Sequence, residues 1–178
     1  MNFVAMDFET ANGRGSSACS LALALVENNQ ITDTFYTLIN PLQDFNYRNI
    51  AIHHIRPADV EKAPTFDQIW PHIQDLFTLD NIVAAHNANF DIRVLRQTLA
   101  MFNLQAPSYY AIDTVRTSRK LYPEMPNHKL NTVASLLKIP LHHHHHALDD
   151  TIACAEILIK TAAQFGEEPI KKMTKIIS

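Results

Sequence analysis

Two acidic residues, Asp7 and Glu9, lie inside an otherwise apolar run that extends from Phe3 to Thr10. The run predicts a buried strand, in which side chains two positions apart point to the same face. Two carboxylates on one buried face would repel each other and lose hydration, at a cost of several kcal/mol. A divalent cation would remove this cost, so the pair indicates half of a metal site. The alternative is a frayed strand end whose acids are solvated.

Two further acids lie at the starts of expected helices. Asp91 comes between an expected strand over 81–86 and an expected helix over 92–102, and Asp150 comes early in an expected helix over 146–165. The helix dipole favours acids at such positions and Asn89 is a suitable cap, so a purely structural role is the alternative for Asp91. Since sites in α/β sheets assemble at the ends of neighbouring strands, we expect Asp91 and Asp150 to complete the cluster.

Five consecutive histidines, 142–146, precede the last helix. A solvated loop accounts for most of them, and a transition-metal patch is an alternative because imidazole suits zinc, copper and nickel. On a straight helix, residues four apart share a face, whereas residues five apart lie about 140° apart. Periodicity alone would therefore pair Asp150 with His146 rather than with His145.

Three segments together resemble the exonuclease motifs of the DEDDh family, which includes the proofreading subunit of bacterial DNA polymerase III and ribonuclease T. They are Asp7-Phe8-Glu9-Thr10, the segment from His86 to Asp91, and the segment from His145 to Asp150. The third motif is H-x-A-x-x-D, and Ala147 sets its register on His145. The resemblance covers roughly residues 1–162.

The resemblance implies a ribonuclease-H-like fold and 3′→5′ removal of nucleotides with two Mg²⁺ or Mn²⁺ ions. It carries metal-ligand roles onto four carboxylates and a general-base role onto one histidine: Asp7, Glu9, Asp91 and Asp150, and His145. These assignments agree with the preference of Mg²⁺ for hard oxygen ligands and with an imidazole that titrates near neutral pH.

Six other residues are candidates for contact with the substrate: Thr10, Arg14, His53, His86, Asn87 and Phe90. Arg14, in a glycine-bearing loop, could contact a phosphate, and Phe90 could stack on a base. Each has a plainer alternative, namely a surface helix position for His53, strand-end hydrogen bonding for His86 and Asn87, and core packing for Phe90. Ala11 replaces the second Thr that the family usually has after Thr10.

The remaining pattern predicts one α/β domain with a mixed central β-sheet of about five strands flanked by helices. Expected strands cover 3–9, 20–26, 30–39, 81–86 and 109–113, and expected helices cover short pieces of 47–78 and then 92–102, 115–121, 130–137 and 146–165. Gly166 should end the last helix. We therefore expect an exonuclease domain over 1–165 and a weakly ordered C-terminal tail over 166–178.

The composition fits one soluble globular domain, with 178 residues, 47% hydrophobic and 19% charged. The formal net charge of −3 gives no global basic field, so nucleic acid would have to be held locally. Cys19 and Cys154 are too few for a disulfide framework, which suits a reducing compartment. No signal peptide or membrane-length apolar run is found, so we expect a cytoplasmic protein without membrane contact.

The leading hypothesis is a metal-dependent 3′→5′ exonuclease that acts on single-stranded or frayed 3′ ends of DNA or RNA and releases nucleoside 5′-monophosphates. Its expected partner is a nucleic acid with a 3′ end, with a DNA polymerase or repair complex as a further candidate. Two alternatives belong to other classes. One is a catalytically silent exonuclease-like module that binds nucleic acid within an assembly, and the other is a histidine-rich metal-binding protein.

Overall fold

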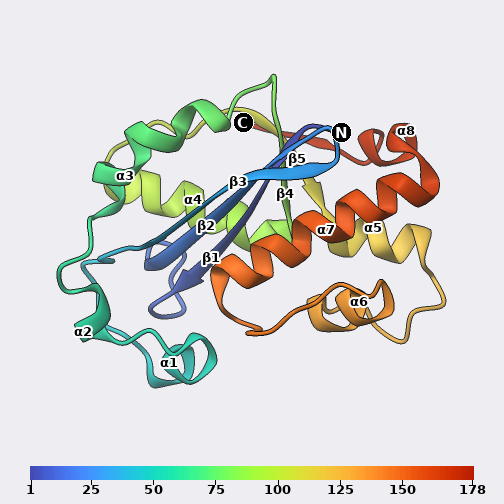
Figure 1. Cartoon of the computed structure of the whole chain (residues 1–178). Helices are drawn as coiled ribbons and strands as arrows, with labels where there is room; N and C mark the ends of the chain where they lie inside the picture. Colours follow the sequence, from blue (N-terminus) through green and yellow to red (C-terminus); the bar gives the residue numbers. More distant parts are fainter.

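The apolar runs form six strands in the computed structural model, which describes residues 1–178 (Figure 1). The strands are β1 Phe3–Thr10, β2 Ala18–Glu27, β3 Gln30–Leu38, β4 Ile82–Ala85, β5 Tyr109–Asp113 and β6 Lys175–Ile177. They form one sheet in the order β3-β2-β1-β4-β5-β6. The neighbours β1, β4 and β5 are parallel, and the remaining pairs are antiparallel. This mixed sheet confirms the predicted α/β class.

Helices cover both faces of the sheet. They are α1 Tyr47–His53, α2 Pro57–Val60, α3 Phe66–Ile73, the 3₁₀ turn η1 Gln74–Leu76, α4 Ala88–Met101, α5 Thr114–Leu121, α6 Leu130–Leu136, α7 Ala147–Phe165 and α8 Glu167–Lys171. The long helix α7 crosses one face of the sheet, with α5, α6 and α8 against it, and α3 and α4 lie on the other side (Figure 1).

Strand β1 divides its side chains between these two layers. Met6 and Phe8 belong to the core cluster that α3 and α4 contribute to, whereas Ala5 belongs to the cluster that α7 contributes to. Asp7 and Glu9 have the same parity as Ala5, so they point to the α7 face at the end of the strand. The sheet thereby aims both carboxylates at the layer that contains α7.

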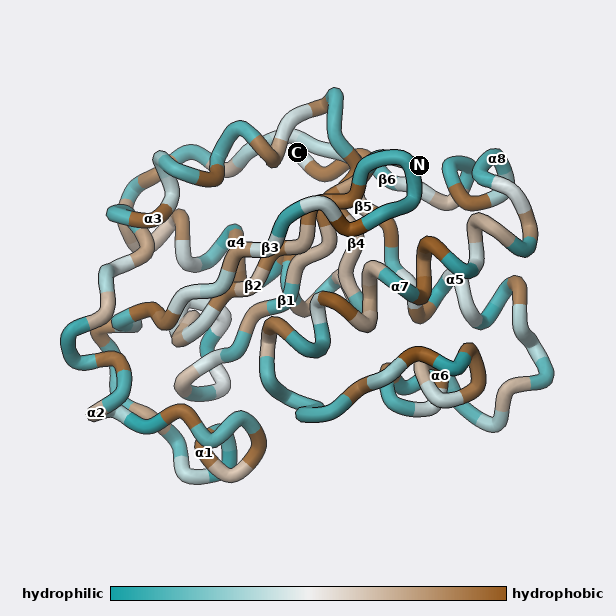
Figure 2. The backbone as a smooth tube through the Cα atoms, viewed as in Figure 1, coloured by the Kyte–Doolittle hydropathy of each residue, from teal (hydrophilic) through white to brown (hydrophobic).

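Apolar residues are concentrated on the central strands, and the loop that leads into α7 is mostly hydrophilic (Figure 2). Neither α7 nor any other helix has both the length and the apolar character needed to cross a membrane.

The C-terminal residues differ from the expectation of a weakly ordered tail. Residues 167–171 form α8, and Lys175–Ile177 forms β6, which pairs with β5 and raises the strand number from about five to six. Burial explains this order, because Ile170 is fully enclosed in the core cluster beneath α7 and the N-terminal amino group of Met1 pairs with Glu167. The segment is too short for either periodicity to be read from its sequence.

Candidate active site

The predicted acids meet at the carboxyl ends of the parallel strands. Strand β4 pairs with β1 only at Val4 and Ala5, so β1 continues beyond its neighbour. There the N–H of Phe8 donates a hydrogen bond of 3.1 Å to Oδ1 of Asp91, which lies in the first turn of α4. Asp91 is only 1% exposed. Beyond the end of β4, the carboxylate of Asp91 thus takes the position beside β1 that a neighbouring strand would otherwise fill.

Asp150 reaches the same place from the other layer. It lies in the first turn of α7, where its carboxylate accepts bonds of 3.0 Å from the N–H of His145 and 3.1 Å from Nδ1 of His144. Asp7, Glu9 and Asp150 each offer an oxygen within 4.8 Å of the others. Carboxylates from β1 and α7 therefore form one cluster, and the buried Asp91 is tied to the same strand by its bond from Phe8.

Burial and mutual repulsion disfavour the charged forms of these acids. Burial is the main cause that raises the pKa of Glu9 to about 8, with Asp150 and Asp91 adding to it. Burial likewise raises the pKa of Asp91 to about 8, against the hydrogen bond from Phe8. The pKa of Asp7 lies well above its usual value, because of burial first and then Asp91, Glu9 and Asp150. No lysine or arginine forms an ion pair with these carboxylates, and the basic group within ion-pair distance is His144, 3.1 Å from Asp150.

The side chains present fit a divalent cation. Oδ2 of Asp7 is buried without any hydrogen-bond partner, although it lies among carboxylates that face one another. An orphaned buried oxygen is costly unless a cation or water binds it. A site made of carboxylate oxygens suits hard cations such as Mg²⁺ and Mn²⁺.

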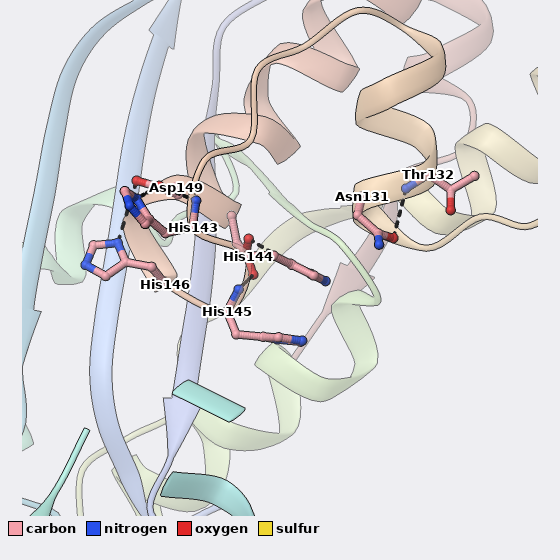
Figure 3. A network of polar contacts seen from close by, with 8 residues as sticks. Asn131, Thr132, His143, His144, His145, His146 and Asp149 are labelled. Atoms are coloured by element: carbon pink, nitrogen blue, oxygen red, sulfur yellow. Dashed lines mark hydrogen bonds and ion pairs between the residues drawn. The ribbon is translucent and has the colours of Figure 1, made fainter. Parts of the chain in front are cut away.

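The histidines before α7 separate into two groups (Figure 3). His143 and His146 turn toward Asp149, with Nδ1 at 2.9 Å and 3.7 Å from its carboxylate oxygens. The rings of His144 and His145 stack at 3.9 Å on the side of Asp150. His145 has a left-handed backbone, with φ of 71°, and α7 begins two residues later. This turn, rather than helical periodicity, brings His145 to the cluster.

A cleft of about 880 Å³ opens above the carboxylates. Its walls include most of the candidate residues, namely Asp7, Glu9, Asp150, His145, His86, Asn87 and Phe90. Four other candidates do not line it: Thr10, Arg14, His53 and the buried Asp91. Arg14 borders a separate hollow together with Leu42.

The buried His53 and the partly buried His86 are held by backbone and hydroxyl groups. Nε2 of His53 lies 3.1 Å from the carbonyl of Thr10, and its Nδ1 accepts from the N–H of Ile55. Nε2 of His86 donates to the carbonyl of His128 at 3.0 Å, and Nδ1 contacts the hydroxyl of Thr114 at 2.8 Å. Burial lowers the pKa of His86 to about 4, so its ring is neutral at neutral pH. His86 supports the cleft wall and is bonded on both nitrogens.

Other walls of the cleft have no firm assignment from the sequence. Arg119 of α5 and the residues 127–131 before and within α6 line the cleft, and His144 contacts Asp150 directly. Of these, Arg119 and Lys129 belong to the basic residues that the sequence predicts to flank the site. The other sequence signal is the polar run Asn127-His128-Lys129 ahead of an apolar helix. A polar run of this kind is equally typical of an ordinary loop, so it did not identify a wall of the cleft.

Comparison with known proteins agrees with this geometry. A family model described as Exonuclease matches residues 4–158. The DNA polymerase III PolC-type of Caldanaerobacter subterraneus subsp. tengcongensis is 31% identical over 178 residues, which cover 99% of this chain and 13% of that protein. A putative bifunctional exonuclease/endonuclease protein of Mycobacterium tuberculosis is 28% identical over 186 residues, which cover 99% of this chain and 29% of that protein. The chain thus spans a small part of the curated relatives it matches.

Solved exonucleases share the fold over nearly the whole chain. Exonuclease X in complex with 5′ overhanging duplex DNA superposes with a TM-score of 0.79 and 25% identity, covering 96% of this chain and 98% of that chain. The nuclease domain of 3′hExo, described as a DEDDh family member bound to rAMP, gives a TM-score of 0.78 at 17% identity, covering 99% and 96%.

The fold and the carboxylate cluster define a ribonuclease-H-like α/β protein of the exonuclease class. Because the family model matches most of its length, the chain belongs to the exonuclease family, whose members are hydrolases.

Proposed function

We propose that this chain hydrolyses single-stranded or frayed 3′ ends of DNA or RNA, using two divalent cations, Mg²⁺ or Mn²⁺. The observation that supports this most is the convergence of Asp7, Glu9 and Asp150 within 4.8 Å, with the orphaned oxygen of Asp7 among them, beneath an open cleft. Asp91 is the fourth ligand in this proposal. When bound, the cations would supply Lewis-acid stabilisation of charge on the scissile phosphate and on the attacking and leaving oxygens.

His145 acts as the general base in this proposal. Partial burial first, and then the neighbouring His144, lower the pKa of His145, so the imidazole is neutral and can accept a proton at neutral pH. A water oxygen attacks phosphorus while the bond to the 3′ oxygen of the preceding nucleotide breaks. The water proton passes to His145, and the leaving 3′ oxygen takes up a proton. The product is a nucleoside 5′-monophosphate.

A splayed strand suits the cleft because the scissile phosphate must reach carboxylates that lie below its rim. Asp7 and Glu9 are only partly exposed, and Asp150 is 5% exposed. A closed duplex end would have to fray to place one nucleotide there. The PolC-type relatives suggest work beside a DNA polymerase, and the DNA-bound and rAMP-bound neighbours make both nucleic acids substrates to test.

The test is digestion of 5′-labelled single-stranded DNA, single-stranded RNA and mismatched duplex DNA with Mg²⁺, Mn²⁺ or EDTA. We expect ladders that shorten from the 3′ end, nucleoside 5′-monophosphates as products, and no release in EDTA. Asp7→Asn should lose the activity because it removes an oxygen ligand from the cluster. Asp80→Asn is the matched control, since Asp80 is exposed at the opposite, amino-terminal end of β4.

Two outcomes would contradict the proposal. Absence of metal-dependent release from all three substrates would reject hydrolysis, and binding without hydrolysis would favour a catalytically silent module. Equal activity of Asp7→Asn and Asp80→Asn would reject the assigned cluster.

A further inference from the structure

A second hollow, of about 580 Å³, lies outside the catalytic cleft and is lined mainly by cations. We call it the α5–β6 groove. Its charged residues come from α5 and from the α8–β6 segment: Arg116, Arg119, Lys120, Lys172 and Lys175. The only other residues that line it are Met173 and Thr174, so no acid does.

The fold gathers these cations from two distant parts of the sequence. Arg116, Arg119 and Lys120 share one side of α5, because they are three and four positions apart. Antiparallel pairing sets Lys175 of β6 opposite Ala111 of β5, the strand that leads into α5. Lys172 follows α8, which Ile170 anchors in the core. The groove exists because the C-terminal residues are folded.

The charges in the groove are not neutralised within the chain. All five side chains are exposed, and none forms an ion pair, whereas the nearby Lys171 pairs with Glu167 and Glu168. The groove holds five of the fifteen Lys and Arg residues in a chain of net charge −3. Such a local concentration of positive charge in an acidic protein attracts polyanions.

The groove is continuous with the catalytic cleft through Arg119, which lines both hollows. We propose that the α5–β6 groove binds the phosphate backbone of nucleic acid on the 5′ side of the terminal nucleotide that occupies the cleft. This inference rests on the proposed function. Arg and Lys side chains fit the task, since guanidinium groups bind phosphate bidentately and ammonium groups bind it as point charges.

The groove predicts a dependence on substrate length. A dinucleotide fills the cleft alone, whereas a long oligonucleotide also reaches the groove. The triple variant Lys120→Gln, Lys172→Gln, Lys175→Gln should therefore raise KM for a long single strand and leave the rate on the dinucleotide unchanged. The matched control removes three exposed cations that line neither hollow: Lys62→Gln, Arg96→Gln and Lys138→Gln.

Binding without divalent cations gives a second readout that needs no hydrolysis. Each phosphate contact on a single strand contributes about 0.7 to the slope of log affinity against log salt, so the triple variant should lose about 2 from that slope. Fluorescence anisotropy with a labelled long single-stranded DNA measures it. We expect the control to keep the wild-type slope.

An unchanged salt slope and an unchanged KM for the long strand in the triple variant would overturn the proposal that the groove binds nucleic acid. An equal loss in the control would overturn it too, because net charge alone would then explain the effect. Failure of wild-type dinucleotide hydrolysis would instead count against the proposed function, and the anisotropy measurement would still decide the groove.

Discussion

Adjacent histidines ahead of α7 have different surroundings. The ring of His146 lies against Tyr36, with centroids 5.1 Å apart, and its Nδ1 is 3.7 Å from Asp149. His145 lines the cleft, and its backbone N–H holds Asp150. The difference arises because residue 145 has a left-handed backbone, which sends consecutive side chains to opposite sides of the loop.

We therefore expect His145→Ala to reduce kcat by about 100- to 10,000-fold, the usual contribution of a general base. His146→Ala should leave kcat within a few-fold, because its ring contacts Tyr36 and Asp149 outside the cleft. Steady-state hydrolysis of a dinucleotide measures both. The rate of the wild type should fall as pH drops through the lowered pKa of His145, and His145→Ala should lose this limb. The reverse ranking of the two variants would reject His145 as the base.

Sequence information at this scale predicted which acids come together, because two residues of a strand and two helix starts are positions that the fold itself defines. Periodicity favoured His146, which the structure turns toward Asp149, and only the spacing of the H-x-A-x-x-D motif pointed to His145. The loop before α7 follows no regular period, and neither do residues 127–129, which line the cleft before α6. Their placement depends on tertiary contacts, such as the bond between His128 and His86.

At the scale of elements, the alternation of strands and helices was sufficient to predict the mixed sheet and its flanking helices. The segment α8–β6 could not be predicted, because five helical residues and a three-residue strand carry no measurable period. Its order comes from burial of Ile170 and from pairing with β5. Both are contacts with residues far away in the sequence.

Substitutions in the C-terminal segment test this account. Ile170→Ala should lower the free energy of unfolding by about 2–5 kcal/mol, because it leaves a cavity in a fully enclosed site. Ile176→Ala is the matched control, since Ile176 is 61% exposed and should change stability by less than about 0.5 kcal/mol. Urea unfolding measures both variants. Equal, small effects would mean that α8 does not dock on the core.

At the scale of the whole molecule, the carboxylate cluster lowers the stability of the metal-free fold, and the rest of the fold must offset this loss. Two apolar core clusters, one on each face of the sheet, fix β1, α4 and α7 and so hold the acids together. The packing of these two clusters thus offsets the unfavourable repulsion among the carboxylates. A bound cation should relieve the repulsion and stabilise the entire domain, since ligands that bind only the folded state shift the unfolding equilibrium.

This coupling predicts an unusual pH dependence for the metal-free protein. Glu9 and Asp91 have folded-state pKa values of about 8, above the ordinary values of carboxylic acids. Between the ordinary pKa of a carboxylic acid and about 8, the folded state binds more protons than the unfolded state. The free energy of unfolding therefore falls as pH rises, over roughly pH 4.5 to 8. The stability that protonation supports is therefore greatest at the acidic end of this window. Added Mg²⁺ should increase the free energy of unfolding most at the alkaline end, where the cluster is ionised.

Thermal unfolding in EDTA and in Mg²⁺ across this window measures the effect. The expected result is a Tm in EDTA that falls with rising pH, together with a Mg²⁺-induced increase in Tm that grows with pH. Glu9→Gln should flatten the metal-free profile, because it removes one of the titrating groups and its repulsion. Asp80→Asn should leave the profile unchanged, since Asp80 is exposed and distant from the cluster. If the wild type and Glu9→Gln lost stability in parallel, the slope would come from groups outside the site, and the link between cation binding and global stability would be rejected.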